Sequence, residues 1–193
     1  VMNKQRQVVY NLRNKVLSNA GVQEEVLTMV DDLLEDAVLT ICSEEIKPKD
    51  WDLKQLSERF EFLFKEKSSL PATVDSQLIF DHVRKAARDI YARRVPELSA
   101  RLAELESLSS NEAMPIRVQI SRSEDKPFDL TTIEQDTILE TVDHFWNIHL
   151  QMMDHLREGI GLRGYGQKNP LHEYQKEGFL LFQRMLDTTK EAV

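Results

Sequence analysis

A run of glycines is the first feature of the sequence that could carry chemistry. Gly159, Gly161 and Gly164 stand at the spacing G-x-G-x-x-G. In dinucleotide-binding proteins this spacing forms a turn between a strand and the N-terminus of a helix. Here the residues before Gly159 have the pattern of a long helix, and five further residues follow Gly164 before the next expected helix. The run therefore does not indicate a nucleotide site, and the sequence contains no G-x-x-x-x-G-K-[ST] loop.

Histidines and the single cysteine are the other side chains that could bind metal or act as nucleophiles. His144 and His149 are five residues apart, which places them on different sides of a helix, and no histidine pair has the i, i+4 spacing of a helical metal site. Cys42 ends an apolar helical stretch and reads as a core residue. We predict no catalytic residue, no metal site and no bound cofactor in this chain.

The glycine run also contains exposed-type residues that suggest contact with a partner. Leu162 and Tyr165 lie among the glycines, and Arg157, Arg163 and Lys168 make the segment basic in an acidic protein. A turn between two helices needs only two to five residues, but the expected loop over 159–169 is longer. A flexible turn is one interpretation; a loop that contacts another molecule is the other.

Composition restricts the class of protein. The chain has 193 residues, 41% of them hydrophobic and 30% charged, which is typical of a globular protein. Its formal net charge of −8 disfavours a general nucleic-acid binder. The longest stretch without charged residues, His144–Met153, is too short to span a membrane. One cysteine permits no internal disulfide and is consistent with a reducing compartment.

Charged residues are grouped in blocks along the chain. Val1–Leu17 is basic, Gln23–Ile46 is acidic, and Arg84–Arg101 is basic again. Such blocks are typical of solvated helix faces, or of surfaces that dock against oppositely charged parts of a larger protein.

Apolar spacing of three and four residues predicts a mostly helical chain. The expected helices are Asn3–Leu17, Val22–Ile41, one capped by Asp50 and ending at Phe64, Val74–Val95 and its continuation Leu98–Leu108, Thr131–Glu158, and one that begins at Pro170. Asn19–Gly21 is expected to separate the first two helices, and Pro96 to end or kink the fourth. Ser107–Leu130 is expected to be a loop, in which Ile116–Ser121 alternates like a short strand.

The last sixty residues read as a helical hairpin. Gly159 is placed to be the C-cap of its first helix. Asn169 is placed to cap the second helix, with Pro170 at the first helical position, where a missing N–H costs nothing. The predicted fold class is all-α, with long helices, a C-terminal hairpin and at most one short β segment.

The hairpin segment closely resembles the two-helix finger of the SecA family of bacterial preprotein translocase ATPases. The resemblance is carried by Asp154–Leu171, by Glu173–Phe179, by Trp146 with His149 and Leu150 in a W-x-x-H-L pattern, and by Val1–Tyr10, which looks like the start of the family's long scaffold helix. Ile46–Leu130 corresponds to the family's helical wing by position.

The resemblance implies a domain that is split in sequence. Residues 1–45 would be the first part of the helical scaffold, 46–129 the inserted wing, and 130–193 the second part of the scaffold with the finger, whose tip would be 159–169. Val1 and Val193 both fall inside expected helices, so the chain is expected to be an excised fragment. The family's motor domains, polypeptide clamp and zinc tail would be missing from it.

The resemblance also implies a function. In this family, ATP hydrolysis in the motor domains is coupled to the finger, which enters the cytoplasmic mouth of the SecYEG channel and contacts the moving preprotein. Tyr165 occupies the position of the contacting tyrosine, and its tip neighbours are expected to join it: Leu162, Arg163, Gly164, Gly166, Gln167 and Lys168. Trp146, His149 and Leu150 are expected to form structural core.

Further expectations follow from the same resemblance. ATP and Mg would bind to the full-length protein and no cofactor to this fragment, which would be inactive alone. Its partners would be SecYEG, preproteins, the motor domains of the same chain and the anionic surface on the cytoplasmic face of the inner membrane, with no nucleic acid. Two other interpretations remain open: a free-standing helical adaptor without an unpaired apolar face, and a nucleotide-binding enzyme with a strand ending at Gly159.

Overall fold

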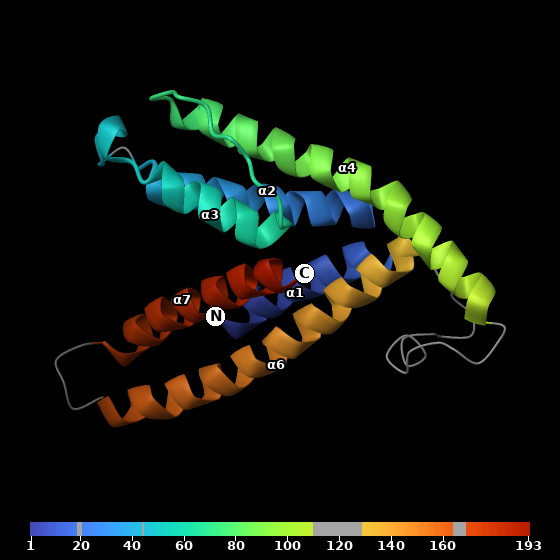
Figure 1. The fold of residues 1–193 in the computed structure, drawn as a ribbon. Coiled ribbons are helices and arrows are strands. Elements are labelled where there is room, and N and C mark those ends of the chain that lie inside the picture. Colours follow the sequence, from blue (N-terminus) through green and yellow to red (C-terminus); the bar gives the residue numbers. More distant parts are fainter. Residues whose placement is uncertain (19–20, 44, 110–128, 164–168) are drawn as a thin grey trace. The chain divides into compact units, whose positions relative to one another are not determined.

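The computed structural model describes residues 1–18, 21–43, 45–109, 129–163 and 169–193 (Figure 1). Their regular structure is helical throughout, and no strand occurs within these ranges, so the all-α prediction is confirmed. The helices are α1 (Met2–Leu17), α2 (Val22–Ile41), the 3₁₀ turn η1 (Pro48–Asp50), α3 (Leu53–Phe64), α4 (Ser76–Ser109), α6 (Leu130–Arg163) and α7 (Pro170–Ala192). The alternating stretch Ile116–Ser121 lies outside the described residues.

The chain forms two compact units. One contains residues 1–22 and 134–193, and is called the hairpin unit below; the other contains residues 23–133, and is called the inserted unit. The hairpin unit is therefore built from the two ends of the sequence, and the inserted unit is the stretch of sequence between them. The scaffold and wing boundaries that the resemblance implies stay a prediction.

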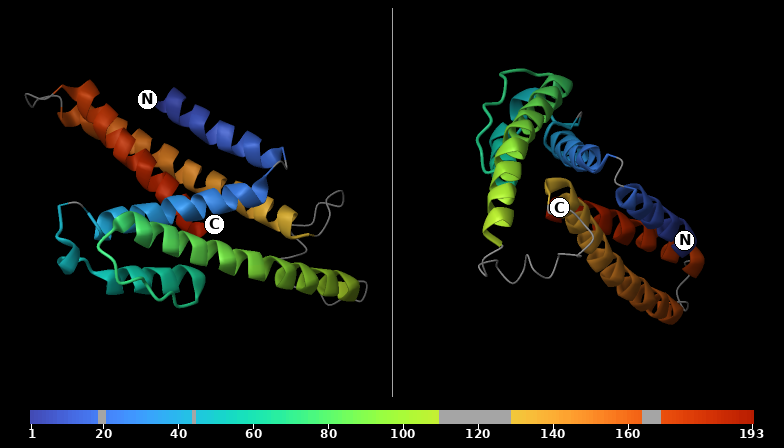
Figure 2. Two further views of the ribbon diagram at one scale, coloured as in Figure 1. Left: turned by 90° about the horizontal axis from the view of Figure 1, so that it is seen from above. Right: turned by 90° about the vertical axis from the view of Figure 1, so that its right-hand side faces the viewer.

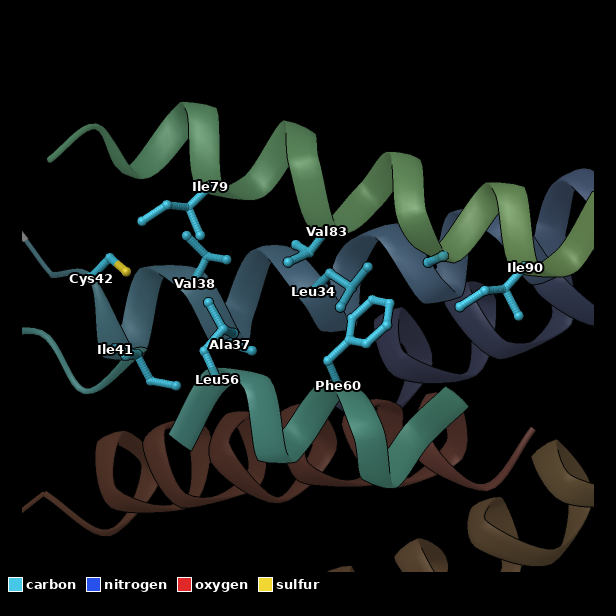
Figure 3. Close-up of a cluster of buried hydrophobic side chains, with 11 residues drawn as sticks. Leu34, Ala37, Val38, Ile41, Cys42, Leu56, Phe60, Ile79, Val83 and Ile90 are labelled. Atoms are coloured by element: carbon cyan, nitrogen blue, oxygen red, sulfur yellow. The ribbon is translucent and has the colours of Figure 1, made fainter. Parts of the chain in front are cut away.

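The core of the inserted unit lies between α2, α3 and α4 (Figure 3). Each helix contributes residues at three-and-four spacing, because only that spacing keeps side chains on one face of a helix. The cluster consists of Leu34, Ala37, Val38, Ile41, Cys42, Leu56, Phe60, Ile79, Val83, Ala87 and Ile90. Cys42 is a member of it, as predicted, and burial raises the pKa of its thiol. The thiol is thus protonated and shielded, which suits packing and not chemistry.

The start of α3 differs from the prediction. Its N-cap is Asp52, whose carboxylate accepts a hydrogen bond from the Gln55 amide at 3.0 Å, and not Asp50. Asp50 ends the 3₁₀ turn instead, because the chain first turns at Pro48 and the Trp51 indole donates a hydrogen bond to the Ile46 carbonyl at 3.1 Å. Because of this turn, α3 begins only at Leu53, and Asp52 is its N-cap.

Two of the charge blocks meet within the inserted unit. Asp31 of the acidic block receives hydrogen bonds from Arg84 and Arg88 of the basic block, at 3.0 and 2.5 Å. Burial raises the pKa of the Asp31 carboxyl, but the hydrogen bonds and charges of Arg88 and Arg84 outweigh burial and hold it below its ordinary value. Here the blocks dock on each other inside the chain.

Pro96 lies inside α4 and does not end it. A proline in a helix removes one backbone donor and its ring crowds the preceding turn. Most residues around it are good helix formers, with Ala92, Arg93 and Arg94 before it and Glu97 and Leu98 after it, and the helix continues through Pro96. Across the described part of the chain, no helix combines the length and the apolar character that crossing a membrane would require.

Candidate functional site at the helical hairpin

The hairpin unit packs α1 beside α6 and α7 (Figure 2). Contacts between α1 and α6 pair Gln5 with His149, Arg13 with Asp143, and the Val16 carbonyl with Gln135. Rising numbers on α1 meet falling numbers on α6, so these helices are antiparallel. The hairpin makes α6 and α7 antiparallel as well, and α1 therefore runs parallel to α7.

The second helix of the hairpin begins as predicted. The Asn169 side chain accepts a hydrogen bond from the Leu171 amide at 3.0 Å, and Pro170 occupies the first turn of α7. The cap satisfies one free donor of the helix N-terminus, and proline there has no amide hydrogen to lose. Local chemistry thus sets where the second arm starts.

The first helix ends later than predicted. Gly159 is not a C-cap, because α6 continues through it to Arg163. A C-cap glycine takes a left-handed conformation, and among the described glycines only Gly21 has a positive φ. Helix, and not strand, precedes the glycine run, so the structure contradicts the nucleotide-site alternative, which requires a strand ending at Gly159.

The predicted contact residues lie mostly beyond the described part of the hairpin. Leu162 and Arg163 belong to the last turn of α6, but their side chains are not described. The other five predicted contacts lie outside the described residues: Gly164, Tyr165, Gly166, Gln167 and Lys168. The structure describes the two arms that would hold them.

Three rings pack together at the centre of the unit. Trp146 and His149 of α6 have ring centroids 5.5 Å apart, and Phe182 of α7 lies 5.5 Å from His149 and 6.5 Å from Trp146. Trp146 retains 9% of its exposure and His149 only 1%, whereas Leu150 is half-buried. The cluster joins the two arms by aromatic contacts that are individually worth about 0.5–1.5 kcal/mol beyond burial.

A buried polar chain crosses the same region. The Gln5 amide nitrogen donates a hydrogen bond to the Gly178 carbonyl at 2.9 Å, and the Gln5 amide oxygen lies 3.0 Å from His149 Nε2. Because that oxygen can only accept, His149 carries its hydrogen on Nε2 and donates it. His149 Nδ1 is buried and has no partner among the described residues. Gln5 is not among the residues predicted from the sequence, although it continues the stripe of Val9, Leu12 and Val16 on α1 one turn earlier.

Lowering the pH is expected to destabilise the hairpin unit through His149. Burial lowers the pKa of its imidazole, so the folded state resists protonation more than the unfolded chain does. The contribution of the neutral imidazole to the free energy of unfolding is therefore complete above the unfolded pKa of about 6.5, and it declines as the pH falls below that value. Urea unfolding at pH 7.5 and 5.5 should show a larger loss for the parent than for His149→Phe. Equal losses would contradict a buried neutral imidazole.

The two helical glycines of the hairpin are expected to respond differently to alanine. An added Cβ at Gly159 would meet open space, so Gly159→Ala should raise stability by up to about 1 kcal/mol through helix propensity. At Gly178 the Cβ would lie 2.8 Å from the buried Met153 methyl carbon, which must move. Gly178→Ala should therefore be the less stable of the two in chemical denaturation, and the reverse order would contradict the close packing.

A small apolar cavity lies beside the aromatic cluster. It holds about 240 Å³ and is lined by Phe145, Ile148, His149, Met152, Leu181, Arg184, Met185 and Thr188. These residues come from α6 and α7 only. The lining suits packing with an apolar group, and it brings together no pair of side chains able to act as acid and base.

The whole chain matches one family model, described as the SecA Wing and Scaffold domain, over residues 1–193. Protein translocase subunit SecA 1 of Thermobifida fusca is 34% identical over 201 residues, which cover 99% of this chain and 18% of that protein. Protein translocase subunit SecA of Pelotomaculum thermopropionicum is 37% identical over 197 residues, covering 100% and 19%. That of Desulfotalea psychrophila is 32% identical over 193 residues, covering 100% and 20%. The chain thus spans about a fifth of the length of these relatives.

Proposed function

Because the chain belongs to the SecA wing and scaffold family, we propose that it is the part of a protein translocase that transmits motor movement to the polypeptide being transported. The observation that carries the proposal is the hairpin of α6 and α7, whose arms are joined by the cluster of Trp146, His149 and Phe182. A hairpin whose arms pack together midway along their length is stiff, so a displacement at one end reaches the other.

Tyr165, at the centre of the glycine-flanked tip sequence, is proposed as the residue that contacts the preprotein. A translocase must engage every sequence, and a tyrosine offers an apolar ring together with a hydroxyl, so it can contact varied side chains and backbone without specificity. The flanking Gly164 and Gly166 add no side chains of their own and would let the backbone approach closely. The adjoining Leu162, Arg163, Gln167 and Lys168 would extend this contact.

The remaining partners are proposed because the chain belongs to the SecA wing and scaffold family. The finger would enter the cytoplasmic side of the SecYEG channel, and ATP with Mg would bind to motor domains elsewhere in the polypeptide. Arg157, Arg163 and Lys168 make the tip segment basic, which suits a peripheral position at an anionic membrane surface.

A free-standing adaptor is supported less well. It would be expected to leave no apolar helix face without a partner, yet α7 exposes the neighbouring side chains of Phe179 and Leu180 by 56% and 47%. Such exposure on one helix is more typical of a part that packs within a larger protein.

The experiment that tests the proposal is a Tyr165 series in the full-length translocase. Tyr165→Ala and Tyr165→Gly should impair ATP-driven preprotein transport, whereas Tyr165→Phe and Tyr165→Met should retain more of it, because contact area provides the grip. Basal ATP hydrolysis should stay close to the parent rate. The free energy of unfolding of each variant should remain within about 0.5 kcal/mol of the parent value, as for other surface substitutions.

Two outcomes would remove the case for Tyr165. One is an alanine variant that transports as well as the parent. The other is a series in which transport falls only where stability falls, since the ring would then act through folding.

A further inference from the structure

Gln5 contacts both arms of the hairpin from a third helix. Its side chain is 6% exposed, and its amide spans from the Gly178 carbonyl of α7 to the His149 ring of α6. The two partners are 173 and 144 residues away in sequence. A single side chain of α1 therefore holds two helices that meet only in the folded unit.

The chemistry of an amide makes this contact specific to one alignment of the helices. The nitrogen end can only donate and the oxygen end can only accept, so each end fits one of the two partners. Sliding α1 by one turn, about 5.4 Å, would break both hydrogen bonds and leave buried groups unpaired. Apolar contacts discriminate less, because one methyl group can replace another.

Two further polar contacts of α1 reach α6. Gln135 donates a hydrogen bond to the Val16 carbonyl at 2.8 Å, and Arg13 pairs with Asp143. These contacts hold α1 on the first arm. Gln5 also binds the second arm, at the level where Gly178 lets α7 approach Met153 closely.

We propose that Gln5 is a positioning residue that fixes the axial alignment of α1 against both α6 and α7, so that α1 and the two arms of the hairpin move as one body. The proposal rests on the transmitting role proposed above and names the residue that couples α1 to the finger. Gln5 acts through the helices and contacts no substrate in this role.

The test compares three variants of the full-length translocase. Gln5→Met removes the amide at nearly constant volume and leaves the His149 donor unpaired. Gln5→Met combined with His149→Phe removes the donor as well and keeps a ring against Trp146 and Phe182. Gln135→Met is the matched control, because it removes the other buried glutamine hydrogen bond between α1 and α6 and leaves Gln5 in place.

Two readouts separate alignment from stability. Spin labels at the exposed Asn14 of α1 and Gln183 of α7 report the distance between these helices, and Cys42 is too buried to take a label. Preprotein transported per ATP hydrolysed reports coupling. In the double variant we expect stability close to the parent, a label distance broadened or shifted by up to about 5 Å, and coupling reduced about threefold or more. Gln135→Met should keep both the distance and the coupling.

Each contrary outcome contradicts one part of the proposal: the alignment role, the coupling through Gln5, or the transmitting function on which both rest. A parent-like distance in both Gln5 variants would refute the alignment role, whether or not the finger transports polypeptide. A shifted distance with normal transport per ATP would refute coupling through Gln5. If Tyr165→Ala also transports normally, the proposed function fails; if Tyr165→Ala is impaired while the double variant is normal, only the inference about Gln5 fails.

Discussion

Trp146→Ala is expected to lower the free energy of unfolding of the hairpin unit by about 3–5 kcal/mol, the range for large aromatic residues removed from a core. Trp146 is 9% exposed and packs against His149 and Phe182, so its removal leaves a cavity between the two arms and ends one aromatic contact with each. Urea unfolding followed by circular dichroism measures the loss.

Asn147→Ala is the control for this prediction. Asn147 is the next residue on α6 and is exposed, so its replacement should change stability by no more than about 0.5 kcal/mol. Trp51→Phe leaves Trp146 as the only tryptophan, and its fluorescence should then be blue-shifted and poorly quenched by iodide. A red-shifted, easily quenched spectrum would contradict the packing of Trp146 between the two arms.

Phe60→Ala is expected to destabilise the inserted unit by a similar amount, about 3–5 kcal/mol. Phe60 is 1% exposed and lies in the cluster between α2, α3 and α4, with the Phe64 ring 4.6 Å away (Figure 3). Truncation removes the largest side chain of this core, and neighbouring backbones held in helices can only partly close the space.

Phe62→Ala on the same helix is a matched control. Phe62 is 72% exposed, and its one described ring contact is with the Lys65 ammonium, 4.5 Å from the ring centroid. An exposed cation–π contact is worth about 0.5–1 kcal/mol, so Phe62→Ala should cost no more than that. Comparable losses for the two phenylalanines in denaturant titrations would mean that α3 does not face the core as described.

Helix positions and their buried faces could be read from the sequence. The spacing of apolar residues in Val22–Ile41 identified α2, and Asn169 with Pro170 identified the start of α7. Both depend on interactions within one turn or two, because a helix bonds its own backbone and its apolar residues recur every three or four positions. Local signals of this kind need no knowledge of the rest of the fold.

Helix ends were predicted less well where competing local signals stood side by side. Asp50 and Asp52 are both good caps, and a 3₁₀ turn held by Pro48 and Trp51 decided between them. Gly159 has the residue type of a C-cap, yet α6 continues through it in open space. Glycine permits a helix to stop but does not require it to, so residue type alone left the end of α6 undecided.

The sequence by itself determined that this chain is helical, which faces are apolar, and that its C-terminal part is a hairpin with a basic, glycine-rich tip. Only the tertiary structure decided the partners of the polar residues within those faces: Asp31 with Arg84 and Arg88, and Gln5 with His149 and Gly178. The physical reason is distance along the chain. Spacing governs contacts within a helix, whereas a buried amide must find a donor and an acceptor on helices more than a hundred residues away.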